Sequence, residues 1–165
     1  MPEPAAVGPG EHQVSGVALP FRYPDGSHDS ETLLVHPATG ALFVLTKSWT
    51  KPSKLYEFPM PFTPDQPALL SERGSLVPPT GANQVTGGDI HPGGAGVLLR
   101  TYSHVFFYAL GKADLATALA GEPRVLPAAV EAQGEAVAWT AAGDGYLTVS
   151  EGAGSALHRS HCRAE

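Results

Sequence analysis

Cysteine, charge and long apolar runs are all scarce in this chain, and each shortage excludes a class of protein. Its 165 residues contain one cysteine, Cys162, so no disulfide can form within the chain. Charged residues are 16% of the total, too few for a charged helical bundle or a coiled coil. The net charge of −6 excludes the basic surface that nonspecific nucleic-acid binding requires. No run of about 18 consecutive apolar residues occurs, so we expect no membrane span.

The N-terminus lacks the features of a signal peptide. Met1–Pro4 is not basic, and no apolar stretch follows it. Without such a signal, the default expectation is a cytoplasmic protein.

Glycine and proline, by contrast, are abundant. The chain has 19 Gly and 16 Pro, roughly a fifth of its residues, where an average protein has about 12%. Apolar residues are 42%, enough for a hydrophobic core and too many for a disordered tail. A core-forming chain that is interrupted so often by helix-breaking residues is expected to be all-β, with short strands between many turns.

One pattern, a strand followed by a Pro/Gly turn and a second strand, occurs three times. The turns fall at 37–40, 92–96 and 143–145. The residues just before these turns are 55 and then 49 residues apart, measured between His36, His91 and Thr140. A repeat of about 50 residues with four short strands is typical of a β-propeller blade. We therefore predict about three four-stranded antiparallel blades, half of a six-bladed ring.

Four segments complete this prediction. Residues 1–15, rich in Pro, Gly and Ala, are expected to be a flexible N-terminal segment, and 16–165 a partial β-propeller domain. A strand is expected at 17–23, ahead of the first blade, and another at Leu69–Val77 as the outer strand of that blade. Helix-forming residues at 113–120 predict one short helix, inserted in the second blade.

Several segments resemble a known family. The resemblance is carried by five short motifs: Phe21–Gly26, Asp29–Gly40, Val85–Pro92, Leu99–Tyr102 and Gln133–Ala136. They are similar to uncharacterised bacterial β-propeller proteins of WD40-like or NHL-like type, and more distantly to phytase-like esterase propellers. Members usually carry further blades upstream, so the resemblance implies a chain that lacks the N-terminal half of its ring, or a half-ring that pairs with a second copy as a homodimer. It also implies relatives that are secreted or lipid-anchored.

One acid lies near the opening of each predicted inner strand, namely Glu31, Asp89 and Glu135. Because inner strands line the central channel of a propeller, we expect these carboxylates to converge at one mouth of it. Converging carboxylates need a cation or shared protons, and oxygen ligands favour Ca²⁺ or Mg²⁺. The alternative interpretation is structural, with each acid accepting hydrogen bonds from backbone N–H groups of the neighbouring blade and fastening the ring.

Arg100 is a charged residue inside an apolar strand. It is expected to pair with one of the axial acids, in a bidentate contact that would replace a metal, or else to bind an anionic ligand.

The remaining candidates for chemistry are histidines and the cysteine. His36 and His91 precede equivalent turns and are expected to serve those turns. His158, His161 and Cys162 have metal-ligating side chains, but no second cluster elsewhere in the sequence complements them, so we expect no metal site there.

These observations favour a noncatalytic binding or interaction module that depends on a missing half or a partner copy. The alternative is a metal-dependent hydrolase of phytase-like or lactonase-like type. In that case Glu31, Asp89 and Glu135 would hold a divalent cation that polarises a phosphoryl or carbonyl oxygen. A third interpretation is a nonfunctional remnant of a longer gene.

Overall fold

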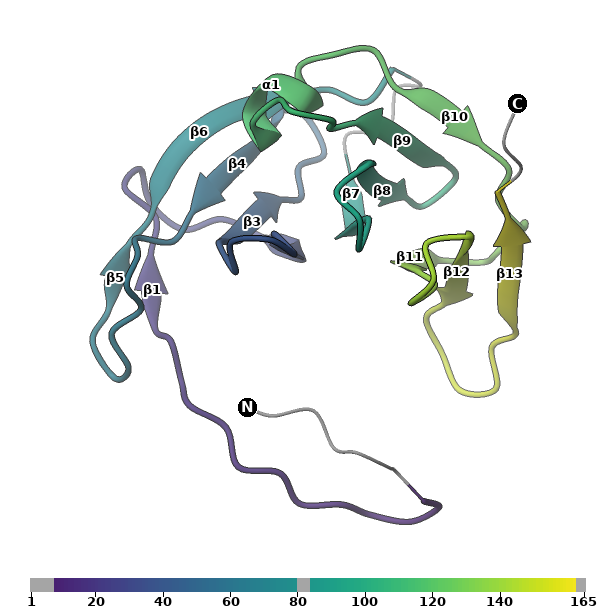
Figure 1. Ribbon diagram of the computed structural model, residues 1–165, viewed down its shortest axis with the longest axis horizontal. Helices are drawn as coiled ribbons and strands as arrows, with labels where there is room; N and C mark the ends of the chain where they lie inside the picture. The colour runs from purple at the N-terminus through teal and green to yellow at the C-terminus, as the bar shows by residue number, and fades with distance from the viewer. Residues whose placement is uncertain (1–7, 80–83, 163–165) are drawn as a thin grey trace.

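In a computed structural model, which describes residues 8–79 and 84–162, the chain is an all-β protein with three antiparallel sheets (Figure 1). Sheet I contains β2 (Ser30–Val35), β3 (Leu42–Thr46), β4 (Ser53–Glu57) and β6 (Ser71–Leu76). Sheet II contains β7 (Val85–Ile90), β8 (Gly96–Thr101), β9 (Val105–Ala109) and β10 (Arg124–Leu126). Sheet III contains β11 (Gly134–Trp139), β12 (Gly145–Ser150) and β13 (Leu157–His161).

The sheets fan out around an open arc, with β2, β7 and β11 along its inner side (Figure 1). The predicted all-β class and the hairpins around 37–40, 92–96 and 143–145 are confirmed. The prediction of four strands in every sheet is wrong for sheet III, which has three strands within the described residues. No closed ring forms from these three sheets.

One short helix, α1 (Leu115–Leu119), lies between β9 and β10, inside the predicted 113–120 segment. Asp114 caps its N-terminus, since the side chain accepts a hydrogen bond from the backbone N–H of Thr117 at 2.9 Å. Among the described residues, no helix has the length and apolarity needed to cross a bilayer.

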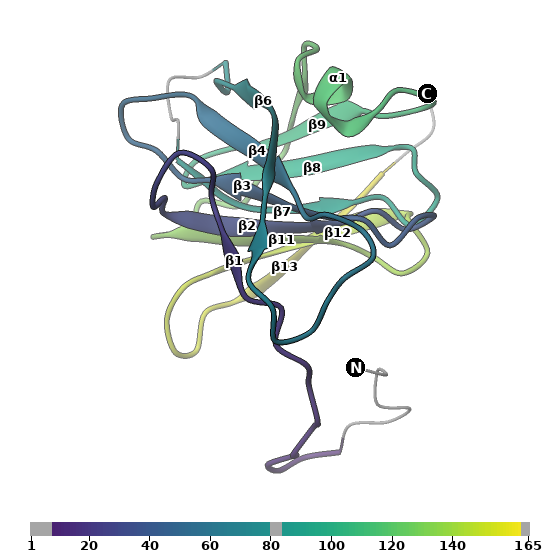
Figure 2. The same ribbon diagram turned by 90° about the vertical axis from the view of Figure 1, so that its left-hand side faces the viewer.

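A separate pair of short strands lies on the outer side of sheet I. β1 (Phe21–Arg22) pairs in parallel with β5 (Ala68–Leu69), and the turned view shows β1 crossing the strands of sheet I (Figure 2). The strand predicted at 17–23 is thus two residues long. Residues 8–15 are exposed and form neither helix nor strand, whereas 1–7 of the predicted flexible segment lie outside the described residues.

The inner strands β2, β7 and β11 share a β-bulge one residue after they begin. The bulged residues are Glu31, Thr86 and Glu135. Beyond the bulge the three hairpins have the same register, so a residue of one sheet has a counterpart in the others. Val35, Ile90 and Trp139, the last residues of the three strands, are one such set.

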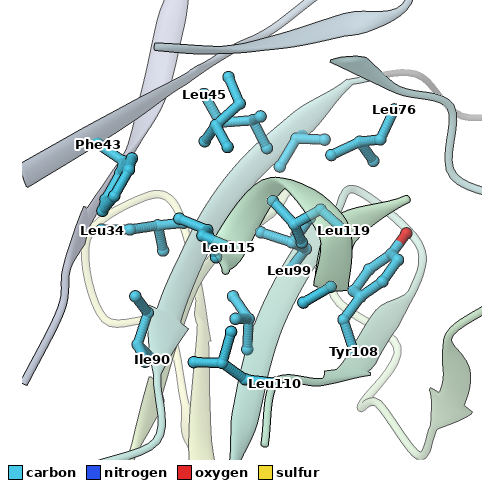
Figure 3. Packing of buried hydrophobic residues seen from close by; sticks show 14 of the residues in the cluster. Leu34, Phe43, Leu45, Leu76, Ile90, Leu99, Tyr108, Leu110, Leu115 and Leu119 are labelled. Atoms are coloured by element: carbon cyan, nitrogen blue, oxygen red, sulfur yellow. The ribbon is translucent and has the colours of Figure 1, made fainter. Parts of the chain in front are cut away.

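Each sheet has a forward face, turned toward the next sheet along the chain, and a backward face, turned toward the preceding one. Side chains alternate between the faces, so β8 sends Leu99 backward to sheet I and Leu98 forward to sheet III. The largest cluster fills the space between sheets I and II, where Leu115 and Leu119 of α1 join it (Figure 3). A second cluster, with Val137 at its edge, joins sheets II and III.

The backward face of sheet I has a third cluster, built on Val44 and Tyr56 and partly covered by the segments around β1 and β5. The segments around β1 and β5 cover β3 and β4 on this face, but they leave Leu33 and Val35 of β2 exposed.

We expect Gly87→Ala to destabilise the protein, because sheets II and III meet closely at this glycine. A Cβ at position 87 would lie 2.5 Å from the backbone oxygen of Glu135, so the two strands would have to separate. Overpacking of this kind costs about 1–3 kcal/mol of unfolding free energy, measurable by urea denaturation.

Gly74→Ala on β6 is the matched control. Its Cβ would lie 3.8 Å from the Ala116 side chain, an ordinary contact. Equal losses of stability in the two variants would contradict the close approach at Gly87.

Candidate functional site

Polar side chains gather at the bulged starts of β2 and β11, around Glu31 and Glu135. The Lys47 Nζ donates to Glu31 Oε1 at 2.7 Å and to the Tyr102 hydroxyl at 2.6 Å, and so joins sheets I and II. Burial alone would lower the pKa of Lys47, but these two hydrogen bonds outweigh burial and raise it. The pKa of Glu135 is also raised, first by burial and then by the negative charges of Glu151 and Glu31.

Asp89 lies at the other end of its strand, so the expectation that Glu31, Asp89 and Glu135 converge is wrong. The register makes Thr86 the counterpart of the two glutamates. The sequence contained this signal, because Glu31, Thr86 and Glu135 each lie five residues before the pre-turn positions, which are His36, His91 and Thr140. Within residues 8–79 and 84–162, no group of three or more His, Cys, Asp and Glu side chains could hold a metal ion.

Asp89 and Thr86 both fasten sheet II to sheet III. Asp89 Oδ2 accepts a hydrogen bond from the backbone N–H of Trp139 at 2.8 Å. The Thr86 hydroxyl donates to the backbone oxygen of Gly134 at 2.8 Å. For Asp89, the geometry therefore matches the structural alternative that the sequence left open.

Arg100 is fully buried and pairs with Glu131, not with one of the three predicted acids. Its Nη2 lies 3.1 Å from Glu131 Oε2, and the two side chains are 1% and 3% exposed. The contact is not bidentate, because only Nη2 bonds the carboxylate, while Nε and Nη1 are buried without a hydrogen-bond partner among the described residues. Thr148 donates to the other carboxylate oxygen at 2.8 Å. Gly134 packs against the guanidinium and leaves no room for a Cβ. Glu131, in the loop before β11, carried no sequence signal of this role.

His36 and His91 accept hydrogen bonds from the backbone of the turns that follow them, as expected. His91 Nδ1 accepts from the backbone N–H of Gly93 at 2.9 Å, and its ring packs edge-on against Trp139 with centroids 4.8 Å apart. His36 Nδ1 accepts from the backbone N–H of Ala38 at 3.3 Å. His158, His161 and Cys162 are exposed, on β13 and just after it.

A cleft of about 750 Å³ opens between sheets II and III beside β13. Its walls include Phe107 and Leu126 from sheet II and Trp139, Tyr146 and Ser160 from sheet III. Between sheets I and II, Leu115 and Leu119 of α1 and Leu76 of the outer strand β6 join the core cluster. The cleft between sheets II and III adjoins β13, the last strand of sheet III among the described residues.

The two ends of the arc expose apolar side chains, although on the forward face of sheet III Arg159 and His161 lie beside Leu157. On the backward face of sheet I, Leu33 is 56% and Val35 49% exposed, whereas Ile90, the counterpart of Val35, is 4% exposed. On the forward face of sheet III, Leu157 is 65% exposed, whereas its counterpart Val105 is completely buried. The exposed positions at the ends are thus buried positions in the middle of the arc.

Comparisons with known proteins add no relationship: no protein-family model matches this chain, and neither does any curated protein.

We expect Glu131→Gln to lower the unfolding free energy by about 3–5 kcal/mol, because it leaves the Arg100 guanidinium buried without its counter-charge. The double variant Arg100→Met/Glu131→Gln, which removes both charges, should recover most of this loss. Urea denaturation of the two variants and the wild type measures the effect. A double variant as unstable as the single one would contradict the charge-pairing argument.

We expect Asp89→Asn to stabilise the protein at pH 7. Burial raises the pKa of Asp89, the hydrogen bonds from Trp139 and Ile90 only partly offsetting it, so ionising this carboxyl costs stability in the folded state. The contribution of Asp89 is therefore most favourable below its unfolded pKa, about 4, and is lost as pH rises through the folded value. Asparagine keeps an oxygen that accepts from Trp139 and removes the charge.

The measurement is the difference in melting temperature between wild type and Asp89→Asn from pH 3 to pH 8. The advantage of the variant should shrink toward zero at the acidic end. An advantage independent of pH would show that charge is not its cause.

Proposed function

We propose that the protein is a noncatalytic interaction module, an arc of about three β-propeller blades whose open end faces bind partner β-sheets. The single observation that carries this proposal is the correspondence between the exposed end faces and faces that are buried within the chain. The chain uses one mode of contact twice, with the forward face of a sheet packed on the backward face of the next.

The two end faces could pack against sheets of a partner in the same way, forward face on backward face. A partner sheet on the backward face of sheet I would cover Leu33 and Val35, and one on the forward face of sheet III would cover Leu157. Burying each such side chain contributes about 1.5–3 kcal/mol.

Three of the four polar residues that the sequence marked as binding candidates have structural partners. Glu31 accepts from Lys47, Asp89 accepts from the backbone of Trp139, and Arg100 is buried against Glu131. These contacts support a structural role for them and a binding role for the apolar faces.

The test is the mass of the purified chain, measured by sedimentation velocity over a range of concentrations. We expect association, and we expect Leu33→Asp or Leu157→Asp to weaken it at least about 100-fold, since a charge would be buried in the contact. Val125→Asp is the control, because Val125 is 53% exposed but belongs to sheet II.

A wild-type chain that stays monomeric at every concentration would overturn the proposal. An equal loss of association in the Val125 control would also count against the end faces as the binding surfaces.

A further inference from the structure

We infer that the segment 17–23, which contains β1, forms the fourth strand of sheet III in a second copy of the chain, and that two copies close one ring by exchanging this segment. The inference rests on the proposed function and names the partner and the way in which it is held.

Strand spacing assigns the segment to this position. In sheets I and II the outer strand directly precedes the inner strand of the next sheet: β6 ends at Leu76 before β7, and β10 ends at Leu126 before β11. The connecting segments are 77–84 and 127–133. β1 ends at Arg22 and is followed by 23–29 before β2, so it stands in the chain as an outer strand of a sheet preceding sheet I.

Among the described residues no antiparallel sheet precedes sheet I, and sheet III of a second copy fits this place. Its forward face would pack on the part of the backward face of sheet I that β2 forms, since Phe62, Ala68 and Leu70 of this chain cover β3 and β4. Its described strands end at β13, with no fourth strand. Two copies related in this way at both ends bring six sheets into one closed ring with twofold symmetry. Closure of this kind leaves no apolar end face exposed.

The ladder that holds β1 in its own copy is short. β1 and β5 pair in parallel over two residues each, and Pro20 and Arg22 accept bonds at 2.9 Å from the backbone N–H groups of Ala68 and Leu70. The Phe21 ring also packs edge-on against Phe58. Along the five residues of β13, residues 18–22 would form a longer antiparallel ladder. Pro20, which has no N–H to donate, is compatible with an outermost strand.

The cleft beside β13 matches the side chains of the segment. Arg22 lies as far before β2 as Leu126 lies before β11, so the two residues are counterparts. Leu126 pairs with Val105, whose counterpart in sheet III is Leu157, so Arg22 would lie opposite Leu157. Antiparallel pairing then places Leu19 opposite Ser160. Ser160 pairs with Tyr146, and both line the cleft. Directly opposite residues share a face, so Leu19 points into the cleft, and Phe21, two residues further along the strand, points to the same side.

The chain after the segment is anchored to its own sheet I, so the exchange need not unfold that sheet. Asp25 accepts from the Tyr56 hydroxyl at 2.7 Å and from Lys54 Nζ at 2.6 Å, and Tyr23 bonds Ser30 at 2.7 Å. The segment from Tyr23 to Asp25 is therefore the place where the exchanged strand leaves its sheet.

The test is disulfide crosslinking of the full chain with its native cysteine replaced, Cys162→Ser. We combine Leu19→Cys with Ser160→Cys, because directly opposite residues in an antiparallel pair lie within disulfide range. β1 and β13 lie at opposite ends of the arc in one copy, so a bond between these positions must join two copies (Figure 1). We expect a covalent dimer, seen on a nonreducing gel, in more than about half of the protein under mild oxidation.

Two further samples make the result specific. A mixture of chains carrying only Leu19→Cys and only Ser160→Cys should also give the dimer. The matched control, Leu19→Cys with Arg159→Cys, places the second cysteine on the opposite face of β13 and should crosslink at least about 5-fold less. Circular dichroism of each reduced variant establishes that it is folded.

The outcomes separate the two proposals. An uncrosslinked chain that still associates in sedimentation overturns the strand exchange and leaves the interaction module in place. A folded, uncrosslinked chain that is monomeric overturns both. A disulfide within one copy, or equal crosslinking in the Arg159 control, also overturns the exchange.

Discussion

Each sheet of this protein is apolar on both faces, and the whole fold depends on covering those faces. The side chains of a strand alternate, so a sheet placed between two others must be apolar on both sides. Sheet II meets this condition: Leu99 is buried toward sheet I and Leu98 toward sheet III. Sheets I and III are each covered by sheet II on one side only. The surfaces proposed for binding are therefore of the same kind as the core, and burying them in a partner would use the same hydrophobic driving force.

Polar contacts determine how the sheets meet. Apolar packing has little directionality, whereas hydrogen bonds between neighbouring sheets select one register. Lys47 joins sheet I to Tyr102 of sheet II, and Asp89 and Thr86 join sheet II to the backbone of sheet III. The buried pair of Arg100 with Glu131 adds a contact to a loop. Glu31, Asp89 and Arg100, which the sequence marked as candidates for ligand binding, thus have partners that explain them structurally.

The predictability of the fold differs from that of the site because the two depend on contacts of different range. Hairpins around 37–40, 92–96 and 143–145 were predictable, since a turn and its flanking strands are neighbours in the sequence. The grouping of Glu31, Asp89 and Glu135 was wrong, because Asp89 lies three residues further along its strand than Thr86, the counterpart of the two glutamates. The partner of Arg100 was also unpredictable, since a loop 31 residues away supplies it.

The sequence by itself determined the all-β class, the repeat and the short helix, because turn residues and alternating apolar positions act over a few residues. Tertiary structure alone decided which face of each strand packs on a neighbouring sheet and which acid bonds which backbone group. It also decided which sheet faces stay exposed. It placed β1 against β5 and left β13 with one strand neighbour among the described residues. These outcomes depend on how whole sheets pack, and no local pattern of residues encodes the position of a sheet relative to its neighbours.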